Sequence, residues 1–160
     1  MAISNITVDI VGAWISKNPD TIPQFNSGIA ARGDNGGLFL YGQAGGAVAQ
    51  GDFIVFNNSY IATTLSTANS PRGAKIGVAR YAMAAGQWGW FQIEGQAPGR
   101  TLAAIAAAAQ LNTTTTPGAI DDDATVGSKR MEAIAILVAA AGATVNTEFM
   151  MSQPYVGITL

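Results

Sequence analysis

The stretch GQWGWFQIEGQ, from Gly86 to Gln96, decides how the rest of the chain can be placed. Glycines near both ends of this run give a strand clear limits. Successive side chains of a strand point to opposite faces, so the run divides into two sets. One face, predicted to be core, carries Gly89, Phe91, Ile93 and Gly95. The other face is aromatic and then polar, which suits a surface that meets a partner, and it carries Trp88, Trp90, Gln92 and Glu94.

The composition predicts one domain that is covered by partners. The chain has 160 residues, enough for a substantial core, and 49% of them are apolar. Only 11% are charged, against roughly 25% in an average soluble domain. A monomer with so few charges would have a poorly solvated surface. We therefore expect much of the surface to be covered by further copies or by another protein. The net charge of −2 gives no reason to expect a nucleic-acid partner.

The chain contains no cysteine and no histidine. Disulfides, thiolate nucleophiles, Cys/His zinc sites and imidazole-based triads are therefore excluded. The longest apolar run extends only from Ala133 to Ala143, whereas a membrane-spanning helix needs about 20 residues. No charged start followed by an apolar segment indicates a signal peptide, since the first basic residue is Lys17. We expect no membrane partner and synthesis in the cytoplasm.

Residues 1–28 have the least regular pattern. Prolines at Pro19 and Pro23 force the preceding residues towards extended geometry. We interpret this segment as an extended N-terminal arm, with residues 29–160 as a single β-rich domain. An ordinary edge strand followed by a loop is the alternative. Trp14 favours the arm slightly, because a tryptophan in a proline-flanked tail has to be buried somewhere.

The middle of the chain has a β pattern. Short apolar or alternating runs recur at about ten-residue spacing, and turn residues separate them. This spacing predicts a mainly β fold, a small antiparallel β-barrel or a sandwich. The predicted strands before the opening stretch are Leu38–Ala44, Phe53–Phe56, Tyr60–Leu65 and Lys75–Ala84, and the last of them forms a hairpin with the opening stretch.

Two later segments are ambiguous. Thr101–Leu111 is rich in alanine, so local propensity favours a helix, whereas the surrounding β pattern allows a strand of small residues. Met131–Gly142 has the same two readings. Thr113–Asp123 is predicted to be a loop, and Thr147–Leu160 an extended segment with Pro154 at an edge or kink.

Two segments resemble a known family. Gly89–Gly95 reads GWFQIEG, and Tyr41–Asp52 reads YGQAGGAVAQGD. Together with the order of the surrounding elements, these segments are similar to those of head decoration, or capsid cement, proteins of tailed bacteriophages. The resemblance extends over about Gly33 to Gly142 and does not include the first 28 residues.

The resemblance implies a structural virion protein and no enzyme. It implies a β-rich homotrimer on the capsid surface that bridges capsomers of the phage major capsid protein and stabilises the head. It also implies that Thr101–Leu111 is a strand, against its local propensity. An extended arm that reaches a neighbour would fit this role. The alternatives are another phage structural component, such as a tail or head-fibre base protein, and a carbohydrate-binding β-module that uses Trp88 and Trp90.

No residue pattern indicates a catalytic site, a cofactor site or a metal site. The carboxylates do not show the spacing of a glycosidase pair. Asp121–Asp123 lacks the alternate-position pattern of a calcium loop, and a solvated acidic loop is favoured over a cation site. Arginines are favoured at interfaces, so the scattered ones become candidates together with the large aromatic residues. The predicted interface residues are Trp14, Phe25, Trp88, Trp90, Gln92, Arg72, Arg80 and Arg100.

Overall fold

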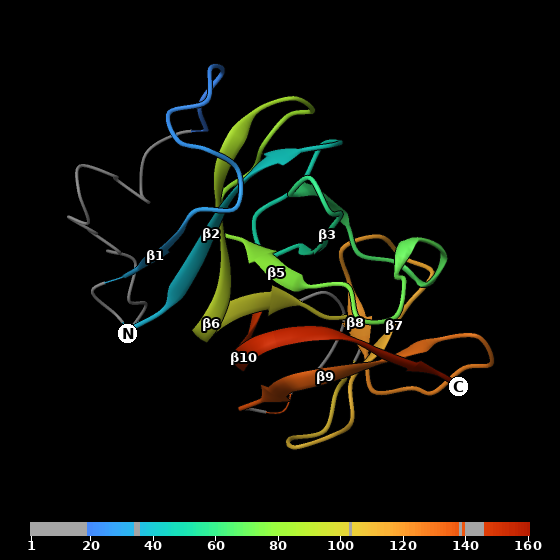
Figure 1. Cartoon of the computed structure of the whole chain (residues 1–160). Helices are drawn as coiled ribbons and strands as arrows, with labels where there is room; N and C mark the ends of the chain where they lie inside the picture. Colours follow the sequence, from blue (N-terminus) through green and yellow to red (C-terminus); the bar gives the residue numbers. More distant parts are fainter. Residues whose placement is uncertain (1–18, 34–35, 103, 138, 140–145) are drawn as a thin grey trace.

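The structure, a computed structural model, describes residues 19–33, 36–102, 104–137, 139 and 146–160. Strands dominate this part of the chain, and one turn of 3-10 helix, η1 (Thr67–Asn69), is the single helical element in it (Figure 1). The predicted mainly β class is therefore confirmed. Trp14 and the first 18 residues of the predicted arm lie outside the described residues. The strands are β1 (Ala30–Arg32), β2 (Leu38–Ala44), β3 (Phe53–Phe56), β4 (Ile61–Thr64), β5 (Ile76–Ala79), β6 (Trp88–Arg100), β7 (Asn112–Thr113), β8 (Ile120–Asp121), β9 (Lys129–Ile136) and β10 (Asn146–Thr159).

Five of these strands close into a barrel in the order β2, β4, β3, β5 and β6, because β6 also pairs with β2. Of the two architectures predicted from the sequence, the barrel is thus the one that forms. The pairing is antiparallel except between β2 and β4, where Gln43 lies opposite Ile61 and the strands run parallel. This departure arises because β3 lies on the far side of β4, so that β4 takes the place beside β2. Closure leaves these strands without a free edge along the ring.

Strands β7 to β10, which we call the extension, continue the sheet beyond the barrel. β6 belongs to both parts: its first half pairs with β2 and β5, and its second half pairs with β10. Gly95 marks the change, with a φ of +88° that side chains disfavour. A Cβ at this position would lie 3.0 Å from Cα of Gly37. The stretch Gly86–Gln96 therefore contains the first half of β6, the strand that joins the barrel to the extension (Figure 1).

Two of the three apolar clusters lie on the two sides of the barrel wall at β3. Ile54 and Phe56 of β3 point into the barrel, where they pack with Phe91 and Ile93 of β6. Phe53 and Val55 belong to the second core, which the extension covers with Phe149, Met151 and further buried side chains. The rings of Phe53 and Phe149 meet edge to face at 5.3 Å. The continuous run FIVF is uninterrupted because the strand is buried on both faces.

The alanine-rich stretch Thr101–Leu111 is neither helix nor strand over its described residues. The expected strand does not form. Among the described residues of the stretch, Ile105 and Leu111 are buried in the second core and Ala109 packs against it, whereas the alanines at 104 and 106–108 are exposed. Between Ile105 and Leu111 the chain turns, with Ala108 at a positive φ of 58°. Met131–Gly142 begins within β9, which resolves that segment in favour of a strand as far as Ile136. The predicted loop 113–123 contains the short strand β8.

Candidate interaction surfaces

Residues 19–28, which we call the strap, cross the outer face of β6. The backbones of Asp20 and Trp88 exchange two hydrogen bonds of 2.8 Å each. Further along, the ring of Phe25 lies 5.3 Å from that of Tyr41 and 5.5 Å from that of Trp90. Phe25, a predicted interface residue, is half-buried in this intrachain contact. The described part of the predicted arm therefore packs on its own barrel.

Tyr41 fixes the strap by its hydroxyl group. The hydroxyl donates to Oδ2 of Asp20 at 2.9 Å and accepts the backbone N–H of Gln24 at 3.1 Å. Desolvation by burial is the main reason why the pKa of Tyr41 rises from 10.0 to about 12, and the bond to Asp20 adds to the rise. The phenol therefore stays protonated and keeps donating to Asp20 at neutral pH.

The strap covers the aromatic face of β6, which the sequence predicted to meet a partner. Trp90 is only 7% exposed, and Trp88 is half-buried with its ring stacked on Tyr41 at 6.1 Å. Phe91 and Ile93 on the opposite face are in the barrel core, as predicted. Both faces are thus covered within one chain. The alternation of the sequence identifies the two faces, but it carries no signal that a segment far earlier in the chain covers one of them.

Gln92 is fully buried and bonded within its own chain. Its Nε2 donates to the carbonyl oxygens of Glu94 and Gln96, at 3.0 and 2.9 Å. These bonds give hydrogen-bond partners to the backbone carbonyls on either side of Gly95. Its Oε1 accepts from Arg80 at 3.3 Å. Burial lowers the pKa of Arg80, and the nearby Tyr81 and Glu148 oppose that shift. These two predicted interface residues therefore support the wall of the barrel.

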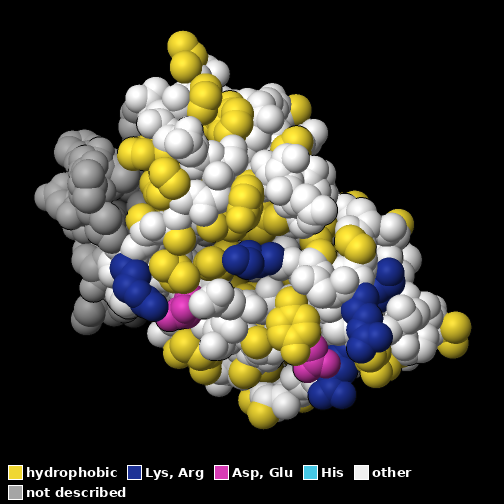
Figure 2. Space-filling view, in the orientation of Figure 1, with side chains coloured by type: hydrophobic (Ala, Val, Ile, Leu, Met, Phe, Trp, Pro, Cys, Tyr) yellow, Lys and Arg dark blue, Asp and Glu magenta, His cyan; other side chains and the backbone are white. Residues whose placement is uncertain are grey.

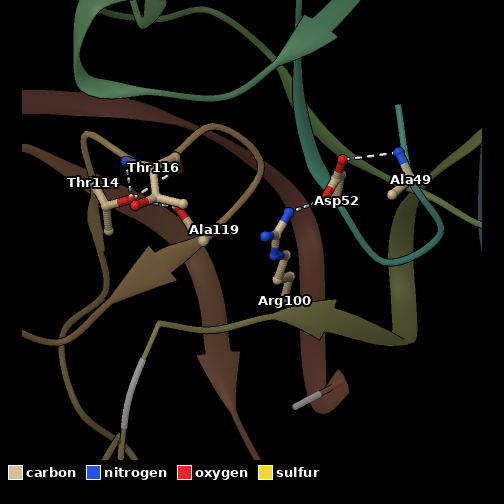
Figure 3. Close-up of polar contacts among 6 residues, drawn as sticks. All are labelled: Ala49, Asp52, Arg100, Thr114, Thr116 and Ala119. Atoms are coloured by element: carbon tan, nitrogen blue, oxygen red, sulfur yellow. Dashed lines mark hydrogen bonds and ion pairs between the residues drawn. The ribbon is translucent and has the colours of Figure 1, made fainter. Parts of the chain in front are cut away.

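Arg100 is held in an ion pair with Asp52 at the end of β6 (Figure 3). Nη1 of Arg100 donates to Oδ1 of Asp52 at 3.1 Å, and Oδ2 of Asp52 accepts the N–H of Ala49 at 2.8 Å. The Asp52 side chain is 6% exposed, whereas that of Arg100 is 35% exposed. The pair ties the turn before β3 to the last residue of β6. Asp52 is thus a turn residue ahead of Phe53, as predicted.

A second polar contact orders the loop from Thr114 to Ala119 beside this pair (Figure 3). The hydroxyl of Thr114 lies 2.9 Å from the carbonyl oxygen of Thr116 and 3.0 Å from that of Ala119. It also accepts the N–H of Thr116 at 3.1 Å. The loop then bonds to the barrel, because Phe53 donates to Gly118 and Gly118 donates to Leu65. The threonine-rich stretch therefore has a structural role.

Arg72 differs from the other predicted arginines because it is exposed and makes no ion pair with a described residue. It lines a pocket that also includes Lys75 and Tyr60. Lys75 and Tyr60 are not among the interface residues predicted from the sequence. The signal for them was weak: Lys75 follows a proline- and glycine-containing loop, and Tyr60 follows a turn of two asparagines.

The acidic residues Asp121–Asp123 make contacts within their own loop region. Oδ2 of Asp122 accepts the N–H of Ala106 at 3.0 Å, so this carboxylate serves a loop. Burial raises the pKa of the Asp121 carboxyl above its ordinary value, and a backbone hydrogen bond from Asp122 opposes part of the rise. Within the described part of the chain, no three acidic side chains are placed to hold a metal ion.

Exposed apolar side chains are concentrated on the extension. Met150 of β10 is 45% exposed and lies opposite Ala135 of β9, which is also exposed. Figure 2 shows one face of the molecule, on which hydrophobic side chains lie among neutral ones and charged groups are few. The large apolar residues exposed on the extension are Val126, Leu137, Met150, Tyr155, Ile158 and Leu160.

The described residues include no helix that is long and apolar enough to cross a membrane. In comparisons with known proteins, no protein-family model, curated protein or solved structure matches the chain.

Proposed function

We propose that this protein is a structural virion protein that binds the outside of a tailed-phage capsid as a homotrimer. In this role it bridges neighbouring capsomers of the major capsid protein and stabilises the head. The resemblance of Tyr41–Asp52 and Gly89–Gly95 to decoration proteins supports the proposal. The protein would be made in the host cytoplasm and would join the virion at the capsid surface.

The observation that carries the proposal is the apolar surface of β9 and β10. Met150 of β10 and Ala135 of β9 are exposed opposite each other, and Leu137 is exposed directly after β9, in a chain with only 11% charged residues. Covering apolar surface contributes about 25 cal/mol per Å², although ordering and association entropy offset much of that term. Many copies on one shell would each contribute such a contact, so a modest gain per copy becomes a large gain for the head.

The test mixes the purified protein with expanded, undecorated heads of the phage that encodes it. We expect electron microscopy to show the protein at fixed positions on the shell. We also expect the heads to withstand higher temperature after binding. Sedimentation of the free protein should give a trimer. A monomer at all concentrations that leaves the heads bare would refute the proposal.

A matched pair of variants locates the surface. Met150→Ser removes an apolar side chain from the extension, and Ile22→Ser removes one that is 70% exposed on the strap. We expect Met150→Ser to weaken trimer formation or head binding about tenfold, a loss of about 1.4 kcal/mol. Ile22→Ser should bind as wild type does. The reverse result would move the interface from the extension to the strap.

A further inference from the structure

A pocket lies between the turn 57–60 and the loop 71–75, and it encloses about 680 Å³. Phe56 forms its buried base, and Tyr60 and Pro71 contribute further apolar surface. Arg72 and Lys75 also line it, and none of its lining residues is acidic. The pocket is large enough for a short peptide segment and carries a net positive charge.

Hydrogen bonds fix the first wall of the pocket. Oδ1 of Asn57 accepts the N–H groups of Ser59 and Ile61, at 2.9 and 3.0 Å. Tyr60 has a φ of +57°, which is costly for an aromatic residue, and its N–H bonds to the carbonyl oxygen of Asn57. The Tyr60 ring lies so close to Gly28 of the strap that a Cβ there would be 2.4 Å from it. Tyr60 is therefore held in place before any partner binds.

The second wall is tied to both parts of the molecule. Gly73 donates to Val156 of β10 at 2.7 Å, and Val156 donates back to Ala74 at 3.0 Å. Lys75 accepts the N–H of Phe56 at 3.0 Å, which joins the loop to β3. Both cations therefore extend from a backbone that is already ordered, so binding requires little additional ordering.

The charges of the pocket are not compensated within the described chain. Arg32, Arg100 and Arg130 each pair with a carboxylate, whereas Arg72 and Lys75 make no ion pair with a described residue. Two neighbouring cations without a partner attract carboxylates and reject other cations. The pocket thus favours an occupant that combines an acidic group with a small apolar group.

The loop between β8 and β9 has this chemistry. Asp123 is exposed and makes no ion pair with a described residue, and Val126 is fully exposed at the tip of a turn. The turn is fixed, because Ser128 donates to Thr125 and Gly127 donates to Leu160. This loop lies beside the carboxyl end of β10 and does not line its own chain's pocket (Figure 1).

We propose that the pocket of one subunit receives the loop 123–126 of a second copy. The carboxylate of Asp123 pairs with Arg72 and Lys75, and Val126 packs between Tyr60 and Pro71. The inference rests on the proposed function, since it supplies the contact that holds the homo-oligomer together. Because loop and pocket are different surfaces, the contact is head to tail, and a rotation that closes it gives a ring such as a trimer.

A charge exchange tests the contact. Arg72→Glu and Asp123→Lys each place like charges together, so we expect each to raise the dissociation constant for self-association at least about tenfold. The double variant restores opposite charges, and we expect it to associate within about threefold of wild type. Thr21→Glu adds an acidic group on the exposed strap and should associate as wild type does. Sedimentation at several salt concentrations measures all four, and circular dichroism checks that each variant folds.

The outcomes separate this inference from the proposed function. If Arg72→Glu associates as wild type does, or if the double variant is as weak as the single ones, the pocket does not receive the loop. If Arg72→Glu keeps the oligomer but no longer binds heads, the occupant is an acidic segment of the shell, and the second-copy inference is wrong. If wild type neither associates nor binds heads, the proposed function itself fails.

Discussion

The barrel and the extension differ in how they cover their strand edges and apolar side chains. The barrel closes β6 onto β2, so that its strands have no free edge and its interior is filled by side chains such as Phe91. The extension covers one face of the barrel and leaves Met150, Tyr155 and Ile158 exposed on β10. The difference indicates that the barrel supplies stability and the extension supplies surface.

The largest loss of stability is expected inside the barrel. Phe91 is fully buried, and its ring meets that of Phe56 edge to face at 5.4 Å. Phe91→Ala should lower the free energy of unfolding by about 3–5 kcal/mol, because it removes buried apolar area and leaves a cavity. Urea denaturation measures the change. A loss below about 1 kcal/mol would mean that the barrel is not the stabilising part.

The ion pair at the end of β6 should have an intermediate effect. Arg100→Met leaves the buried carboxylate of Asp52 with only the N–H of Ala49. We expect a loss of about 1–3 kcal/mol in urea denaturation. Arg32→Met is the matched control, because its pair with Glu94 is exposed and should contribute less than about 1 kcal/mol. Equal losses from the two variants would contradict this account.

Tyr41, which holds the strap, should make the stability of the folded state depend on pH in the alkaline range. Its folded pKa of about 12 lies above the ordinary value of 10.0, so the folded state binds the proton more tightly. This contribution is fully present below pH 10.0 and is lost as the pH rises towards about 12. Tyr41→Phe should cost about 1 kcal/mol at neutral pH and abolish that alkaline loss. Denaturation and tyrosinate absorbance, with exposed Tyr155→Phe as control, measure both effects.

The smallest effect on stability is expected on the extension. Leu137→Ser changes an exposed residue, so the free energy of unfolding should change by less than about 0.5 kcal/mol. Its effect should instead fall on association, measured by sedimentation of folded protein. A loss of stability comparable to that of Phe91→Ala would place Leu137 in the core and remove the distinction between the two regions.

Strands whose burial is visible in their own residues could be predicted from the sequence. Leu38–Ala44 and Phe53–Phe56 have the predicted limits, because alternation and continuous apolar runs follow directly from burial on one or two faces. Thr101–Leu111 was not predictable in this way. Alanine favours a helix when no other contact decides, and here the two anchors Ile105 and Leu111 decide instead.

The candidate sites depended on contacts between distant parts of the chain. The sequence singles out Trp88 and Trp90, but their burial depends on the strap. The strap contacts them in space, although most of the barrel strands lie between it and them in the sequence. Gln92 is polar and therefore suggests a surface, yet its bonds to Glu94 and Gln96 let it be buried. The pocket with Arg72 combines a turn and a loop whose proximity is set by the pairing of β3 with β5.

The closure of the barrel also has a consequence for how the chain reaches its final state. Tyr41 pairs with Trp90 across β2 and β6, which are far apart in the sequence. Contacts of this kind require a large loop to close, so they slow folding. Until β6 reaches β2, the run FIVF has the composition of an aggregating segment and lacks its cover. We therefore expect the yield of refolded protein to fall steeply with chain concentration, even though the finished barrel has no free edge.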